Sequence, residues 1–107
     1  MTDEIREQRE EVDETLLLVS GSKGDKFSDK EYVKKLSNAI LSCFAKQKTA
    51  LLRYVGAASG NNAIKAIAIA IEEAARNGNT WMADPSFTTI KFGDEEKTGI
   101  ILEIVSV

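Results

Sequence analysis

The sequence predicts an α+β fold, a two-layer sandwich in which two helices pack on one four-stranded mixed sheet. Two observations support this prediction. Short apolar runs alternate with longer segments of 3.6-residue periodicity, and the chain ends in two strand-like segments joined by a turn sequence. The predicted order is β-α-β-α-β-β. The 107 residues suffice for one domain. We expect an acidic flexible tail over residues 1–14 and the folded domain over residues 15–107.

The first strand and the first helix are predicted within residues 15–47. Thr15 to Ser20 is a continuous apolar run, typical of a strand that is covered on both faces. Gly21 to Phe27 is predicted as a loop. A helix then begins at Ser28, which stands three residues before Glu31 in the spacing of a capping box. One apolar stripe indicates the buried face of this helix: Val33, Leu36, Ile40, Cys43 and Phe44.

The second strand and the second helix follow. Thr49 to Val55 is the predicted strand, and Gly56 to Gly60 is predicted as a loop of small residues. Asn61 or Asn62 would cap the helix, which ends near Asn77. The high alanine content favours helix over strand here. The predicted buried stripe consists of Ile64, Ile67, Ala68, Ile71 and Ala75.

Ile69 does not belong to that stripe. At 100° per residue it lies roughly 140° from Ile64, among charged residues. An isoleucine on a polar helix face is a candidate subunit contact, so we predict a homodimer or a larger homo-oligomer with Ile69 in the interface.

The last two strands are predicted as a hairpin. Thr80 to Phe92 has strand character but is interrupted at Pro85, whose missing N–H indicates an edge strand, a bend or a bulge. Gly93 to Glu96 is predicted as a short hairpin loop. Lys97 to Ser106 is the last strand, with Ile100, Leu102 and Ile104 on one face.

The composition makes an enzyme improbable. Histidine is absent, which excludes Ser-His-Asp and Cys-His nucleophile systems and removes the commonest metal ligand. The single cysteine, Cys43, lies on the predicted buried stripe and is interpreted as an apolar filler. We expect no catalytic residues, no metal and no cofactor. The sequence shows no apolar run of membrane-spanning length and no secretory signal, so we expect a cytoplasmic protein without a membrane partner.

Charge is distributed unevenly along the chain. The formal net charge is −3 and the isoelectric point is about 5.0. Residues 1–14 carry seven acids and two arginines, whereas residues 15–55 carry eight bases and three acids. The overall acidity argues against a general nucleic-acid coating protein. The basic middle segment nevertheless allows a local surface for nucleic acid or another anion.

Several segments resemble a known family. Tyr54 to Ala70 resembles the second strand, loop and second helix of the stage V sporulation protein S (SpoVS) family, and Leu18 to Ser20 resembles its first strand. Pro85 to Ile90 and Gly93 to Thr98 resemble its terminal hairpin. SpoVS proteins in turn resemble the Alba superfamily, whose members bind nucleic acids, associate as dimers and share this order of elements. The resemblance implies an Alba-like, dimeric, cytoplasmic nucleic-acid-binding regulator, connected with sporulation or development.

The resemblance also implies site residues. Alba proteins use lysines in the loop after the first strand, where this chain has Lys23 and Lys26, and a Gly-centred basic motif before the second helix, which Gly60 and Lys65 match. Ser59 and Asn61 stand where arginines are usual. The Alba hairpin is a long basic arm, whereas we expect a short acidic one here.

Two readings of the function follow. In the first, nucleic-acid phosphates, of DNA or RNA, are contacted by the predicted site residues: Lys23, Lys26, Gly60, Asn61 and Lys65. These groups would lie together because the loops after adjacent parallel strands leave the sheet at the same edge. Binding should be weak and salt-sensitive, because few phosphates are neutralised. In the second, the chain is a homo-oligomeric interaction module whose glycine loop binds a small anionic ligand.

Overall fold

A computed structural model describes residues 16–19 and 26–107. It contains β1 (Leu16–Leu18), α2 (Lys26–Gln47), β2 (Ala50–Tyr54), α3 (Ala57–Arg76), β3 (Trp81–Phe92) and β4 (Glu95–Ser106). This is the predicted β-α-β-α-β-β order, and the α+β class is confirmed. The acidic tail predicted over residues 1–14 and most of the predicted loop after β1 lie outside the described residues.

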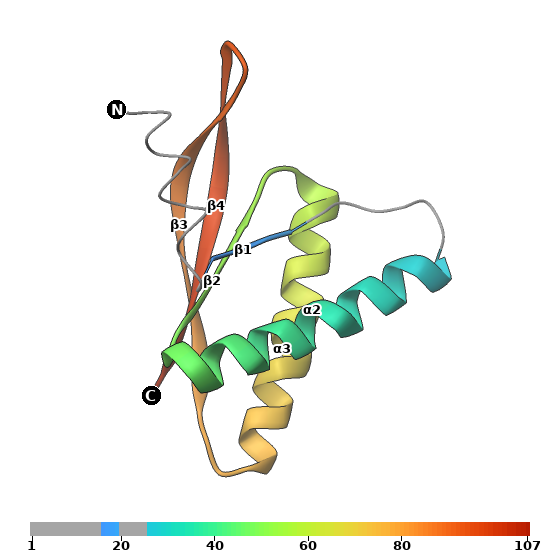
Figure 1. Ribbon diagram of the computed structural model, residues 1–107, viewed down its shortest axis with the longest axis vertical. Helices are drawn as coiled ribbons and strands as arrows, with labels where there is room; N and C mark the ends of the chain where they lie inside the picture. The colour runs from blue at the N-terminus through green and yellow to red at the C-terminus, as the bar shows by residue number, and fades with distance from the viewer. Residues whose placement is uncertain (1–15, 20–25) are drawn as a thin grey trace.

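The four strands form one mixed sheet in the order β1-β2-β4-β3. β1 pairs with β2 in parallel, and the other two pairings are antiparallel. Both helices pack against the same face of this sheet, which gives the predicted two layers (Figure 1). β3 therefore lies at one edge of the sheet, where a proline is tolerated. Pro85 pairs with Leu102 without a break, so the predicted edge position is confirmed and the predicted interruption is wrong.

The core forms between the helices and the sheet. All five residues of the predicted stripe on α2 are buried: Val33, Leu36, Ile40, Cys43 and Phe44. Leu52 of β2 and Ile104 of β4 are fully buried opposite them. The Trp81 ring packs on Phe44 with 4.2 Å between centroids, and this tilted pair closes the end of the core.

α3 begins four residues earlier than predicted. The helix starts at Ala57, after Gly56 at φ 94°, so the predicted Gly56–Gly60 loop and the predicted asparagine cap are wrong. Gly56 alone supplies the backbone conformation that other residues avoid, and the small residues after it continue as helix. α2 likewise begins at Lys26 and not at Ser28.

The buried face of α3 also differs from the prediction. The helix buries Ala63, Ala66, Ile67, Ala70 and Ala74, whereas Ile64, Ala68 and Ala75 are exposed. Alanines allow the helix to lie close to the sheet and to α2, and a stripe of isoleucines would hold it further away. Packing distance, more than side-chain hydrophobicity, therefore decides which face of α3 is inside.

The terminal hairpin is longer than predicted. β3 and β4 have 12 residues each and are joined at Gly93 and Asp94, with Gly93 at φ 62°. β2 pairs with β4 only over residues 100–104, so residues 88–99 pair with one another alone. They form an arm that projects beyond the rest of the sheet (Figure 1). The expectation of a short hairpin is wrong.

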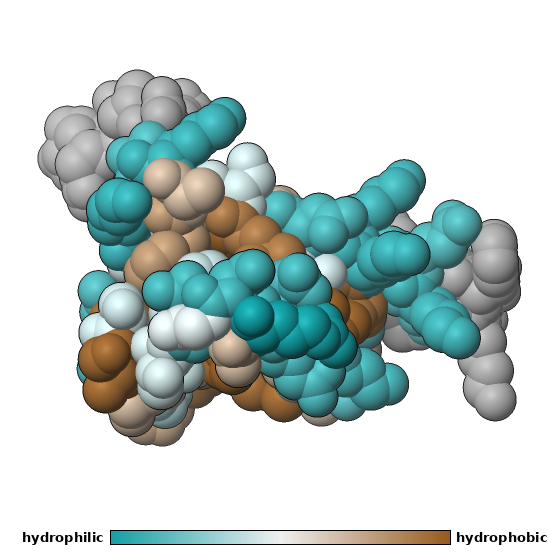
Figure 2. Space-filling view, turned by 90° about the horizontal axis from the view of Figure 1, so that it is seen from below, coloured by the Kyte–Doolittle hydropathy of each residue, from teal (hydrophilic) through white to brown (hydrophobic). Residues whose placement is uncertain are grey.

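Hydrophilic side chains protrude from the end of the molecule where α2 begins. Seen from the side where α3 ends, they stand out there, and hydrophilic and apolar residues are mixed over the rest of this face (Figure 2). Lys30, Lys34 and Lys35 are exposed on this part of α2. The basic segment predicted from the sequence thus lies largely on one helix.

Candidate functional site

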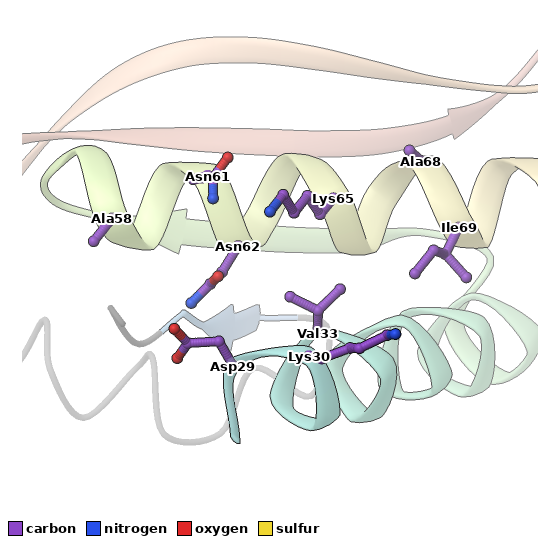
Figure 3. Close-up of a pocket in the computed structure, with 9 residues that line it drawn as sticks. All are labelled: Asp29, Lys30, Val33, Ala58, Asn61, Asn62, Lys65, Ala68 and Ile69. Atoms are coloured by element: carbon purple, nitrogen blue, oxygen red, sulfur yellow. The ribbon is translucent and has the colours of Figure 1, made fainter. Parts of the chain in front are cut away.

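A groove lies between the N-terminal halves of α2 and α3. Its volume is about 680 Å³. α2 contributes Asp29, Lys30 and Val33, and α3 contributes six residues, Ala58, Asn61, Asn62, Lys65, Ala68 and Ile69. In Figure 3 the side chains of Val33, Asn62 and Ile69 point into the space between the helices, and the Lys65 side chain lies along α3. Asn61 and Ala68 lie on the side of α3 that is away from α2. The size is that of a small-ligand site.

Helix periodicity explains why these residues of α3 share a wall. The positions recur at spacings of three and four residues, so they fall on one side of the helix. On this side the alanines leave space that larger side chains would fill. The groove is therefore open because Ala58 and Ala68 are small, while Val33 and Ile69 make its walls apolar.

Two lysines border the groove from different helices. Lys30 and Lys65 are both exposed. The amine of Lys65 extends along α3 toward Asn61, whereas that of Lys30 lies nearer to Ile69 (Figure 3). The carboxylate of Asp29 is turned toward the Asn62 side chain and away from the Lys30 amine. The groove thus carries a net positive charge.

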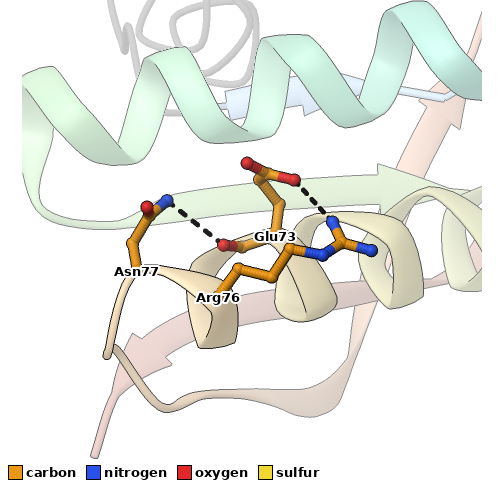
Figure 4. Close-up of polar contacts among 3 residues, drawn as sticks. All are labelled: Glu73, Arg76 and Asn77. Atoms are coloured by element: carbon orange, nitrogen blue, oxygen red, sulfur yellow. Dashed lines mark hydrogen bonds and ion pairs between the residues drawn. The ribbon is translucent and has the colours of Figure 1, made fainter.

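Acidic residues of α3 lie at its other end. Arg76 Nη1 donates to Glu73 Oε1 at 2.7 Å, and Asn77 Nδ2 donates to the Glu73 carbonyl at 3.2 Å (Figure 4). These contacts close the helix near Asn77, as predicted. Because Glu72 and Glu73 follow Lys65 by about two helical turns, the N-terminal half of α3 keeps its positive character.

The structure brings some of the predicted site residues together. Lys65 and Asn61 are exposed and both line the groove. Lys26 is the first residue of α2, and not part of a loop as predicted. Lys23 lies outside the described residues. Sequence reasoning missed Lys30, because one lysine in a lysine-rich helix carries no local signal of what it faces.

Gly60 has a packing role. It is buried within α3, and its N–H donates to the Gly56 carbonyl at 3.0 Å. A Cβ at this position would lie 2.6 Å from Cε1 of Tyr54. The glycine is thus explained by the close approach of the Tyr54 ring, and Tyr54 in turn packs against the core.

Ile69 is 43% exposed, but it lies in the groove wall rather than alone on a polar face. Several other apolar side chains are more exposed, among them Ile64 at 52% and Phe87 at 80%. Phe87 is six residues after Trp81, so it projects from the helix-covered face of the sheet at a point where no helix covers it. Ile64 lies on the flank of α3 that is turned away from the groove.

The hairpin arm offers few cations. Residues 88–99 contain Lys91 and Lys97 against three acids. Lys91 Nζ lies 4.0 Å from Glu96 Oε2, and Lys97 Nζ lies 5.5 Å from the centroid of the Phe92 ring. Both lysines of the arm therefore already have partners within it.

Two searches of the described residues gave negative results. In residues 16–19 and 26–107, no three Cys, Asp or Glu side chains gather as metal ligands would. Neither described helix combines the length and the apolar character needed to cross a bilayer.

Comparison with known proteins gives one match. No curated protein matches the chain. The family model described as Stage V sporulation protein S (SpoVS) matches residues 26–107. The match spans both helices, the groove and the terminal hairpin, and it contains most of the segments whose resemblance was noted in the sequence. The chain therefore belongs to the SpoVS family.

Proposed function

We propose that this protein is a cytoplasmic nucleic-acid-binding regulator that contacts the phosphate backbone of DNA or RNA and acts in sporulation or development. One observation carries the proposal: Lys30 of α2 and Lys65 of α3, both exposed, line the same groove from two different helices. A surface of this kind can follow a phosphate chain because its cations come from two elements. Contacts to phosphates position a protein on its nucleic acid without reading the base sequence.

The expected affinity follows from the number of cations. Contacts by Lys26, Lys30, Lys65 and the predicted Lys23 would neutralise about two to four phosphates. The logarithm of the binding constant should then fall with the logarithm of salt concentration at a slope between about −2 and −4. The hairpin arm adds few phosphate contacts to this number, because Lys91 and Lys97 already have partners within the arm. Binding is therefore weak at physiological salt.

Salt-titrated fluorescence anisotropy tests the proposal. Single-stranded and double-stranded DNA and RNA of equal length serve as probes, with the full chain. The variant Lys30→Gln/Lys65→Gln should weaken binding and make the salt slope shallower by about two. The matched control Lys46→Gln/Lys48→Gln has the same net charge, but its substitutions lie at the far end of α2.

Each result of these binding measurements leads to a different conclusion. Equal losses in the two variants would mean that overall charge, and not this surface, determines binding. A parent protein without salt-sensitive binding would refute the proposed function itself. A third variant, Lys23→Gln, tests the contact that the resemblance implies for the loop before α2.

We propose further that the protein acts as a homodimer. The exposed side chains of Phe87 and of Ile69, the residue predicted for the interface, support this, because large apolar groups on the surface mark contact sites. Light scattering at micromolar concentration should give twice the chain mass. Phe87→Ser and Ile69→Lys distinguish the two candidate faces, since only the substitution in the true interface should yield a monomer. A parent chain that is monomeric under these conditions would refute the dimer.

A further inference from the structure

The groove between α2 and α3 is more apolar than phosphate contacts require. Phosphates need accessible cations and N–H donors, whereas this groove is walled by Val33, Ala58, Ala68 and Ile69. Apolar walls with a few polar groups are the usual lining of a small-molecule site, and about 680 Å³ lies within the usual range of volumes.

The polar groups are placed toward the ends of the groove. The Lys65 amine and the Asn61 side chain lie toward the start of α3, and the apolar surface of Ala68, Ile69 and Val33 follows (Figure 3). A bound molecule would therefore meet the Lys65 amine and the Asn61 amide at one end and apolar side chains beyond them. The Lys30 amine, which lies nearer to Ile69, adds a second positive charge at the edge of this apolar surface, and the carboxylate of Asp29 is turned toward Asn62.

We propose that this groove binds a small amphipathic anion, with its carboxylate or phosphate head at Lys65 and Asn61. Its apolar body lies between Ala68 and Ile69 of α3 and Val33 of α2. Charge complementarity selects an anion, because the groove carries two lysines and one carboxylate. The apolar walls select a molecule with a hydrocarbon or aromatic body over inorganic phosphate.

The test uses three probes and no nucleic acid, so its outcome is independent of the proposed function. 4-Phenylbutanoate represents the amphipathic anion, 4-phenylbutanamide its neutral counterpart, and inorganic phosphate the charge alone. Chemical-shift titration of the full-length ¹⁵N-labelled protein measures each affinity and reports which residues respond. We expect 4-phenylbutanoate to bind about 1.5-fold to fivefold more tightly than the amide, the range for one exposed ion pair. Phosphate alone should produce no saturable shifts in the groove.

Two variants locate the site. Ala68→Trp should fill the groove and abolish binding, whereas Ala75→Trp places the same side chain at an exposed alanine of α3 that does not line the groove. Lys65→Met should reduce the affinity for 4-phenylbutanoate to that for the amide and leave the affinity for the amide unchanged. Equal binding of the acid and the amide to the parent would overturn the proposal. The proposal would also be overturned if Ala68→Trp bound 4-phenylbutanoate as tightly as the parent. If Ala68→Trp does not fold, Lys65→Met still decides the question.

Discussion

Replacing Gly60 with alanine tests the packing of α3 on β2 directly. The new Cβ would lie 2.6 Å from Cε1 and 3.0 Å from Cζ of Tyr54, closer than carbon atoms approach in folded proteins. Alanine is otherwise the better helix former by about 1 kcal/mol, and Gly60 lies inside α3 with no positive φ. Whether Gly60→Ala stabilises or destabilises the protein therefore depends on whether the Tyr54 ring can move away from the new Cβ.

The two contributions can be weighed. Forcing an extra carbon into a packed site costs about 1–3 kcal/mol, which exceeds the gain in helix propensity. We expect Gly60→Ala to lower the free energy of unfolding by about 1 kcal/mol in the parent. In a Tyr54→Leu background the contacting ring atoms are gone. There the same substitution should raise the free energy of unfolding by up to about 1 kcal/mol.

Urea denaturation followed by circular dichroism measures all four members of this double-mutant cycle at one protein concentration. A change of 1 kcal/mol shifts the urea midpoint by about 0.5–1 M for a chain of this size. Tyr54→Phe is the matched control, because it keeps both ring carbons and should keep the loss of stability. The reasoning is refuted if Gly60→Ala has the same effect on stability with tyrosine and with leucine at position 54.

Three further predictions concern other parts of the chain. Lys48 follows α2 at φ 65°, a backbone conformation that favours glycine, and donates its N–H to the Phe44 carbonyl at 2.8 Å. Lys48→Gly should therefore stabilise the protein by about 0.5–1 kcal/mol, measured by thermal unfolding. A loss of stability would contradict this expectation. Gly99→Ala should destabilise by about 2 kcal/mol in the same assay, because its Cβ would lie 2.7 Å from the backbone oxygen of Tyr54, which cannot yield as a side chain can. Deleting residues 1–14, which carry seven acids and two arginines, should leave the unfolding temperature nearly unchanged and tighten nucleic-acid binding at low salt. Weaker binding after the deletion would show that the tail itself contacts the nucleic acid.

The two helices show what sequence patterns can and cannot predict. The apolar residues of the buried face of α2 were all predicted, because they fall on one stripe and the lysines on the others, whereas the buried Ser37 was not. α3 carries alanine or isoleucine on nearly every side, so periodicity alone left several faces possible. The prediction favoured the isoleucines, whereas close packing against the sheet and α2 required the alanines. A pattern of hydrophobic residues does not specify how closely a helix lies to its neighbours.

The candidate site was only partly accessible to sequence reasoning. Lys65 was identified through the family resemblance and Asn61 as the predicted start of the helix, although both were placed beside a loop that is in fact helix. Lys30 and Lys65 line the same groove because of the way in which α2 crosses α3, and no local sequence motif predicts how two helices cross. The length of the arm was missed for a different reason. The acids after Gly93 look like loop residues, yet the turn needs only Gly93 and Asp94, and the strand resumes at Glu95.

The edges of the sheet limit how copies of this protein can join. An open edge exposes unpaired backbone groups that can template the addition of a strand from another molecule. One edge strand, β3, has Pro85 near its middle, and the other, β1, has only three residues. Pro85 removes one N–H donor from the row on β3, two residues before Phe87. A strand from another copy therefore cannot pair continuously along the whole of β3. An association through Phe87 would rest on side-chain contacts at this point of the edge.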